Sequence, residues 1–156
     1  MWSAEVVFAC ALELLGRPKA SVPRVELIEK VPPGISPLAT GYVLLTEKRL
    51  VLITSTAAFA QARRASERCN DAEAIREISA VFVHEEWHLI HGPDEAGAYD
   101  AQMIALLATG ADANGRQFHR IKQTKLAVLA ASKRTAISGV TAGVQAEAEG
   151  GHERNR

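Results

Sequence analysis

The chain is organised around residues 84–102, which read HEEWHLIHGPDEAGAYDAQ. This stretch opens with an H-E-x-x-H pattern, in which His84 and His88 stand one helical turn apart. Because each residue of an α-helix advances by about 100°, side chains at this spacing lie within about 40° of each other. We therefore predict a helix that presents both imidazoles on one face.

Two imidazoles in this arrangement can bind one metal ion, and Glu85 beside them is a candidate general base. Zinc is the expected metal, because it lowers the pKa of a bound water to about 7 and makes hydroxide available at neutral pH. Glu86 and Trp87 point away from this face, so we expect Glu86 to be solvated and Trp87 to pack. The alternative is an ordinary polar helix face, since so short a pattern also arises by chance.

A catalytic zinc site needs a third protein ligand, for which His91, Asp94 and Glu95 compete. His91 shares the helical face, but Gly92–Pro93 end the helix there. Its expected roles are therefore a rim residue, a substrate contact or a cation at the helix C-terminus. Asp94 directly precedes the next predicted helix and suits its N-cap. We prefer Glu95 as the third ligand, with Asp94 as the alternative.

Tyr99 and Gln102 share a face with Glu95 on that next helix, by the same count of about 100° per residue. Tyr99 is a candidate catalytic residue that donates a hydrogen bond to a developing oxyanion. An aromatic core contact explains Tyr99 equally well. Asp100 or Gln102 is expected to orient a ligand imidazole through a hydrogen bond.

These residues resemble the signature of the zincin metallopeptidases. The H-E-x-x-H run is similar to the zincin motif, and Glu95-x-x-Ala98-Tyr99 resembles the glutamate-bearing helix of the gluzincins. The layout is also similar to that of small bacterial and phage-linked minimal zincins, including the ImmA/IrrE-like group, in which a strand or hairpin precedes the motif helix. The resemblance implies that the two motif histidines and Glu95 bind zinc and that Glu85 is the catalytic acid and base.

The spacing leaves the branch of the zincins open. The interval from His88 to Glu95 is short for a gluzincin. The spacing of His84, His88 and Asp94 instead resembles the metzincin pattern, with His91 where that pattern has glycine.

Composition sets the broad class. Of the 156 residues, 47% are hydrophobic and 23% are charged, which is typical of a soluble globular protein. We predict one domain over residues 1–137 and a disordered tail over 138–156, which is rich in Gly, Ala and Glu. The formal net charge of zero gives no reason to expect a nucleic-acid partner. No run approaches the ~18 apolar residues that span a membrane, and residues 3–16 indicate an amphipathic helix rather than a signal peptide.

Cys10 and Cys69 are the two cysteines of the chain. Two widely separated thiols favour a reduced protein over a disulfide scaffold, so we predict unpaired, buried or half-buried cysteines and a cytoplasmic location. A single bridge between them is the alternative.

The pattern of apolar residues predicts the elements. We expect a helix over residues 3–16, a strand over 24–31, a loop over 32–41, and a hairpin over 42–54 for which one bent strand is the alternative. Further helices are expected over 55–69, from Asn70 or Asp71 to Gly92, over 95–109 and over 117–136. The fold class is therefore α+β, with a small β-sheet or hairpin packed on a zincin-like helical bundle that carries the motif helix.

Three functions follow from these features. The favoured one is a zinc-dependent peptidase that hydrolyses a peptide bond in a peptide or protein substrate, with an exposed strand edge pairing with the substrate. The second is a catalytically inactive metal-binding or regulatory module on the same fold. The third, which the neutral charge disfavours, is a nucleic-acid-associated protein that uses Arg63–Arg68 and the basic helix over 117–136.

Overall fold

The computed structural model describes residues 1–138. Within that range the chain has the predicted α+β fold class. In chain order, its elements are α1 (Ala4–Leu15), a short 3-10 turn (Lys19–Ser21), β1 (Val25–Ile28), β2 (Gly41–Leu44), β3 (Arg49–Ile53), α2 (Ala57–Arg63), α3 (Ala72–His91), α4 (Glu95–Ala108) and α5 (Arg116–Ser138). The predicted tail over 138–156 lies outside the described residues, except for Ser138, which ends α5.

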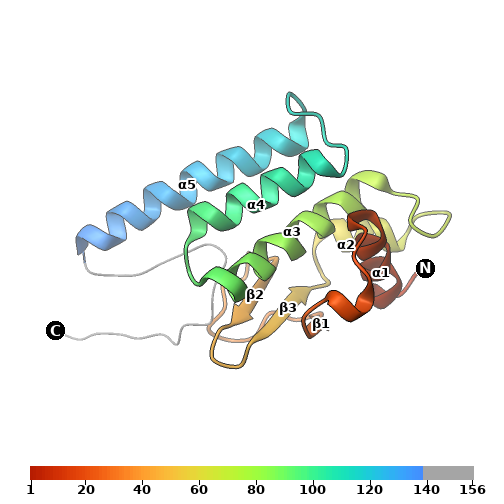
Figure 1. The fold of residues 1–156 in the computed structure, drawn as a ribbon, viewed down its shortest axis with the longest axis horizontal. Coiled ribbons are helices and arrows are strands. Elements are labelled where there is room, and N and C mark those ends of the chain that lie inside the picture. The colour runs from red at the N-terminus through yellow and green to blue at the C-terminus, as the bar shows by residue number, and fades with distance from the viewer. Residues whose placement is uncertain (139–156) are drawn as a thin grey trace.

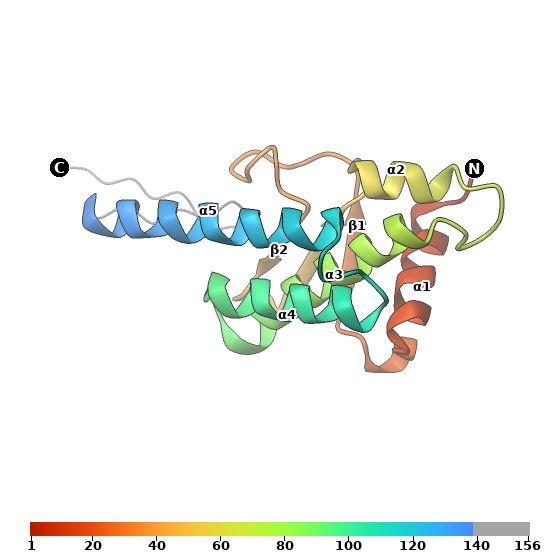
Figure 2. The ribbon, with the colours of Figure 1, turned by 90° about the horizontal axis from the view of Figure 1, so that it is seen from above.

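The elements are arranged around α3. Figure 1 shows α4 beside α3 and α5 beside α4, while the sheet, α1 and α2 lie on the other side of α3. Figure 2, seen from above, shows that the C-terminal part of α5 extends beyond the other elements. The motif helix is thus held between two layers, which fixes the direction of each of its faces.

Within the described residues, the sheet has three strands in the order β1-β3-β2. β2 and β3 pair antiparallel, with Leu44 opposite Arg49, which confirms the hairpin over the single bent strand. Lys48 in the turn has a φ of 50°, a left-handed backbone conformation. β1 is shorter than the predicted strand and pairs parallel with β3. β2 therefore lies at an edge of the sheet.

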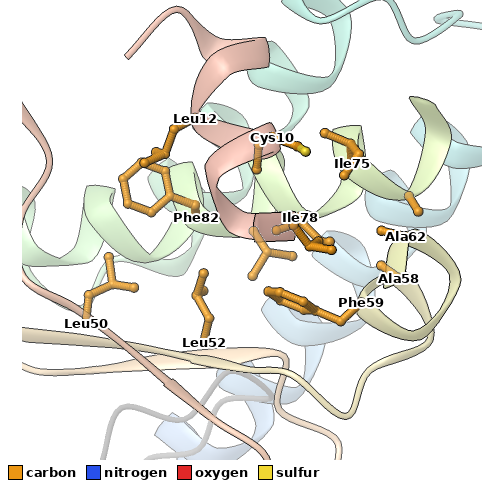
Figure 3. Packing of buried hydrophobic residues seen from close by; sticks show 14 of the residues in the cluster. Cys10, Leu12, Leu50, Leu52, Ala58, Phe59, Ala62, Ile75, Ile78 and Phe82 are labelled. Atoms are coloured by element: carbon orange, nitrogen blue, oxygen red, sulfur yellow. The ribbon is translucent and has the colours of Figure 1, made fainter. Parts of the chain in front are cut away.

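The apolar stripe of α3 is buried. Figure 3 shows Ile75, Ile78 and Phe82 packed among side chains of α1, α2 and β3. On the side that faces α4, Ala80 packs with Leu106. Full burial of each large aliphatic or aromatic side chain stabilises the fold by about 1.5–3 kcal/mol. Burial on both sides therefore leaves α3 little freedom to rotate, and its polar face stays fixed.

Caps define the ends of the N-terminal helices. The side chain of Ser3 accepts a hydrogen bond from the Val6 N–H, and α1 ends at Gly16, whose φ is 68°. α2 begins after Thr56 and is shorter than the predicted 55–69 segment.

None of the described helices combines the length and the apolar character that a bilayer crossing requires.

The prediction of unpaired cysteines is wrong. Cys10 of α1 and Cys69, in the loop before α3, form a disulfide across 59 residues of sequence, with their Cα atoms 5.4 Å apart. The packing of α1 along α3 brings the two segments together, which spacing in the sequence cannot reveal. The cysteines thus no longer support a reducing compartment, and the cytoplasmic location stays a prediction.

Candidate metal centre

Two consecutive helices and a tight reversal between them build the site. Asp71, rather than Asn70, caps the start of α3, because its side chain accepts a hydrogen bond from the Ala74 N–H. α3 ends at Gly92, whose φ of 90° suits glycine. Asp94 then caps α4 through the Ala96 N–H. The reversal lays α4 against α3, so the first turn of α4 meets the last turns of α3 (Figure 1).

Both motif imidazoles are held by their Nδ1 atoms. His84 Nδ1 lies 2.8 Å from Gln102 Oε1, and His88 Nδ1 lies 2.8 Å from the carbonyl oxygen of Gly92. A carbonyl oxygen only accepts, so each Nδ1 carries the hydrogen and donates. When such a ring is neutral, its Nε2 atom keeps a lone pair, which is the form in which histidine binds a metal.

The two Nε2 atoms converge on one carboxylate oxygen. Glu95 Oε1 lies 3.3 Å from His84 Nε2 and 2.7 Å from His88 Nε2. Two lone-pair acceptors come as close as 2.7 Å only when a proton or a metal ion lies between them, whereas His84 Nε2 has no hydrogen-bond partner within residues 1–138. A tetrahedral site with metal–ligand bonds of about 2.05 Å has edges of about 3.3 Å. The His84–Glu95 distance already equals that edge, while the His88–Glu95 distance is that of a hydrogen bond.

The short distances between these groups shift their pKa values. Burial lowers the pKa of His84 below its usual value, against the opposing effect of Glu95. Burial also acts to lower the pKa of His88. This effect is outweighed by hydrogen bonds to Glu95 and Gly92 and by the charges of Glu85 and Glu95, which raise the pKa of His88 to about 9. Burial raises the pKa of Glu95, but its two histidine partners outweigh burial and lower it. A proton on His88 thus occupies the place that a shared metal ion would take.

Glu85 lies next to both imidazoles under the edge of the sheet. Ligand atoms of His84, Glu85 and His88 all come within 4.8 Å of one another, and the Glu85 residue is 1% exposed. A Cβ built on Gly41 of β2 would lie 3.1 Å from Glu85 Cγ. Glu95 Oε1 contacts both Nε2 atoms and Glu85 lies beside the two rings, so either carboxylate could supply an oxygen ligand next to the histidines.

Tyr99 closes the wall of the site on α4. Its ring packs edge-on against the ring of His84, with centroids 4.6 Å apart, and it is fully buried. Burial and the charges of Glu95 and Glu85 raise the pKa of Tyr99, so the hydroxyl keeps its proton. Among residues 1–138 its oxygen has no hydrogen-bond partner. The aromatic contact and the capacity to donate a hydrogen bond are therefore both present.

The competing residues lie outside this cluster. Asp94 is exposed and serves as the helix cap. His91 is exposed and stacks on Trp87, with ring centroids 4.4 Å apart. Asp100 pairs with Lys125, so Gln102 is the residue that holds an imidazole.

The expectation that Glu86 is solvated is wrong. Both oxygens of its carboxylate accept hydrogen bonds of 2.8 Å from the guanidinium of Arg17, and its side chain is 15% exposed. Glu86 stands two residues from both His84 and His88, about 200° around the helix, so the pair lies away from these candidate ligands.

Sequence reasoning missed two backbone contributions. The carbonyl of Gly92 holds His88, and the absence of a side chain at Gly41 makes room for Glu85. A glycine at the start of an apolar strand does signal a close backbone approach, but Gly41 was expected to end a loop.

Comparisons of this chain with protein-family models, curated proteins and solved structures give no match. What the structure establishes is a buried group of His84, Glu85 and His88 on one helix, which can hold a metal ion and is compatible with a zincin site.

Proposed function

We propose that this protein is a zinc-dependent metallopeptidase of the gluzincin-like minimal type. The observation that carries this proposal is the convergence of the Nε2 atoms of His84 and His88 on the carboxylate of Glu95, with Glu85 beside them. Nitrogen from two histidines and oxygen from one glutamate is the donor set of many catalytic zinc sites.

Each residue of the site has its own proposed role in hydrolysis. His84, His88 and Glu95 would hold the metal ion, which when bound supplies Lewis acidity and lowers the pKa of water. Glu85 takes the proton of the attacking water and passes it to the leaving amine. The protonated hydroxyl of Tyr99 donates a hydrogen bond to the oxyanion that develops on the peptide carbonyl.

The edge strand β2 is the proposed place for an extended peptide. β2 lies at one edge of the sheet, and its first residue, Gly41, lies against Glu85. A peptide that paired with β2 would therefore run past the general base. Pairing through the backbone would align the scissile bond, while side-chain pockets would set the specificity.

A second candidate function is a catalytically inactive metal-binding or regulatory module. Deep burial favours it, because His84, His88 and Tyr99 are 0% exposed. Structural zinc sites are closed, whereas catalytic sites keep one position open for water.

The two candidates differ in a measurable way that needs no known substrate. In cobalt-substituted protein, a small peptide hydroxamate should change the visible absorption spectrum if one coordination position is open. An unchanged spectrum at saturating hydroxamate would support the closed module. Hydrolysis of a quenched fluorescent peptide library by the wild type, lost in Glu85→Gln with the zinc retained, would support the peptidase. Equal turnover by wild type and Glu85→Gln would refute the role of Glu85.

A further inference from the structure

A glycine lies inside the first turn of α4, two residues after Glu95. A Cβ built on Gly97 would lie 2.2 Å from Cζ2 and 2.4 Å from Cη2 of Trp87, and 3.0 Å from Asp94 Oδ2. Carbon atoms in van der Waals contact are about 3.5–4.0 Å apart, so no side chain fits between this helix and the indole. Alanine has the higher helix propensity and occupies both neighbouring positions, Ala96 and Ala98. Helix formation alone therefore does not explain a glycine at position 97.

Trp87 is held on its other sides as well. Its ring stacks on His91 at an interplanar angle of 25° and meets the ring of His88 edge-on, with centroids 6.0 Å apart. The indole therefore fills the space between the end of α3 and the start of α4. Its contact with Gly97 sets how closely the two helices approach there.

The same two turns carry the contact on which the metal centre depends. Trp87 directly precedes His88 on α3, and Gly97 follows Glu95 on α4, while His88 Nε2 lies 2.7 Å from Glu95 Oε1. A side chain at position 97 would push the first turn of α4 away from Trp87. Glu95 would move with that turn, and its carboxylate would leave the two Nε2 atoms.

We propose that Gly97 is a positioning residue, which acts through Trp87 to set the place of Glu95 relative to His84 and His88. This inference rests on the proposed metal site, but it does not require the site to be catalytic. The sizes of the side chains at positions 87 and 97 should therefore depend on each other, so that a larger side chain at position 97 requires a smaller one at position 87.

A double-mutant cycle tests the pair. Zinc affinity is measured by competition with a chromophoric chelator for the wild type, Gly97→Ala, Trp87→Leu and the double variant. Gly97→Ala should weaken zinc binding by about tenfold or more, the range found when a residue that orients a ligand is lost. Trp87→Leu in the same chain should restore much of that loss, because the smaller side chain leaves room for the new methyl group.

Two further readouts separate positioning from simple loss of structure. The cobalt absorption spectrum of Gly97→Ala should change in position or intensity and return towards that of wild type in the double variant. Thermal unfolding of the metal-free variants shows whether each is folded. Wild-type zinc affinity and cobalt spectrum in Gly97→Ala would overturn the proposal. A folded double variant that binds zinc no better than Gly97→Ala does would also overturn the proposal. If Gly97→Ala does not fold, the zinc affinity of the double variant is the deciding measurement. A wild type that binds no zinc would overturn the metal site together with this inference, whereas zinc binding without hydrolysis would refute only the peptidase.

Discussion

His88 Nε2 lies 2.7 Å from Glu95 Oε1 and joins the last turn of α3 to the first turn of α4. The contact is favourable only while a cation lies between the two atoms, because both are acceptors otherwise. In the metal-free protein that cation is a proton on His88, and in the proposed zinc form it is the metal. Proton and metal therefore compete for the same place, and pH acts on the two forms in opposite directions.

Metal-free protein should become less stable as the pH rises. The pKa of His88 is raised from 6.5 to about 9 in the folded state, chiefly by Glu95 and Gly92 against the effect of burial. The protonated ring therefore contributes stability that is fully present below pH of about 6.5 and is lost as the pH rises through about 9. Urea unfolding in EDTA across this range should show the decline. Glu95→Gln should flatten it, and an equally steep decline in that variant would contradict the assignment.

Zinc binding should show the reverse dependence. The metal needs the neutral ring of His88, so binding releases the proton and becomes tighter as the pH rises from about 6.5 to about 9. Calorimetric titrations in buffers of different ionisation enthalpy would count the released protons. An affinity that does not change over this range would show that His88 is not a ligand.

Gln102 should matter through the imidazole that it holds. Gln102→Leu removes the acceptor for His84 Nδ1, and zinc affinity should fall by about 10–100-fold. The control is Gln117→Leu, since Gln117 is also buried but binds Arg76 and the Glu73 carbonyl instead. Both variants should lose some fold stability, but only Gln102→Leu should show a lower zinc affinity. Similar zinc affinities in the two would contradict the orienting role.

Gly41→Ala should disturb Glu85, the proposed general base, rather than the proposed metal ligands. The added Cβ would lie 2.9 Å from the Val51 carbonyl oxygen and 3.1 Å from Glu85 Cγ. Overpacking of this kind costs about 1–3 kcal/mol in unfolding free energy, which denaturant titration would measure. Zinc content should stay that of wild type while any hydrolysis falls. A variant as stable and active as wild type would show that Glu85 does not depend on this close approach.

Reduction of the disulfide should weaken the fold without removing the metal site. The bridge between Cys10 and Cys69 closes a segment of 59 residues, for which loop-closure entropy gives a stabilisation of about 4 kcal/mol. A phosphine reductant should lower the urea midpoint of wild type and leave the Cys10→Ala/Cys69→Ala variant unaffected. Zinc affinity should not change, because neither sulfur lies in the site. An unchanged midpoint on reduction would contradict the bridge.

The periodic parts of the molecule could be predicted from the sequence. Regular helices carry the residues concerned, so a count of about 100° per residue places His84 beside His88 and Glu95 beside Tyr99 and Gln102. Gly92–Pro93 marks the reversal, which identifies the two helices that face each other. Asp94 has the properties of an N-cap in the sequence and is one in the structure.

Contacts between distant segments could not be predicted in the same way. The Cys10–Cys69 bridge, the Arg17–Glu86 pair and the approach of Gly41 to Glu85 each depend on how α1 or β2 packs on α3. The contact between Trp87 and Gly97 is closer in sequence, but it depends on the angle of the reversal between them. Such distances are set by tertiary packing, which periodicity does not encode.

The metal content of the purified, untagged chain is the most direct test of the proposed zinc site. Wild type, Glu95→Ala and Asp94→Ala would be stripped with chelator, offered zinc and freed of excess metal before elemental analysis. We predict about one zinc ion per chain in the wild type and in Asp94→Ala. Glu95→Ala should lose it, because it removes the carboxylate oxygen that lies 3.3 Å and 2.7 Å from the two Nε2 atoms. Zinc in none of the three proteins, or zinc kept by Glu95→Ala and lost by Asp94→Ala, would contradict the site described for this protein.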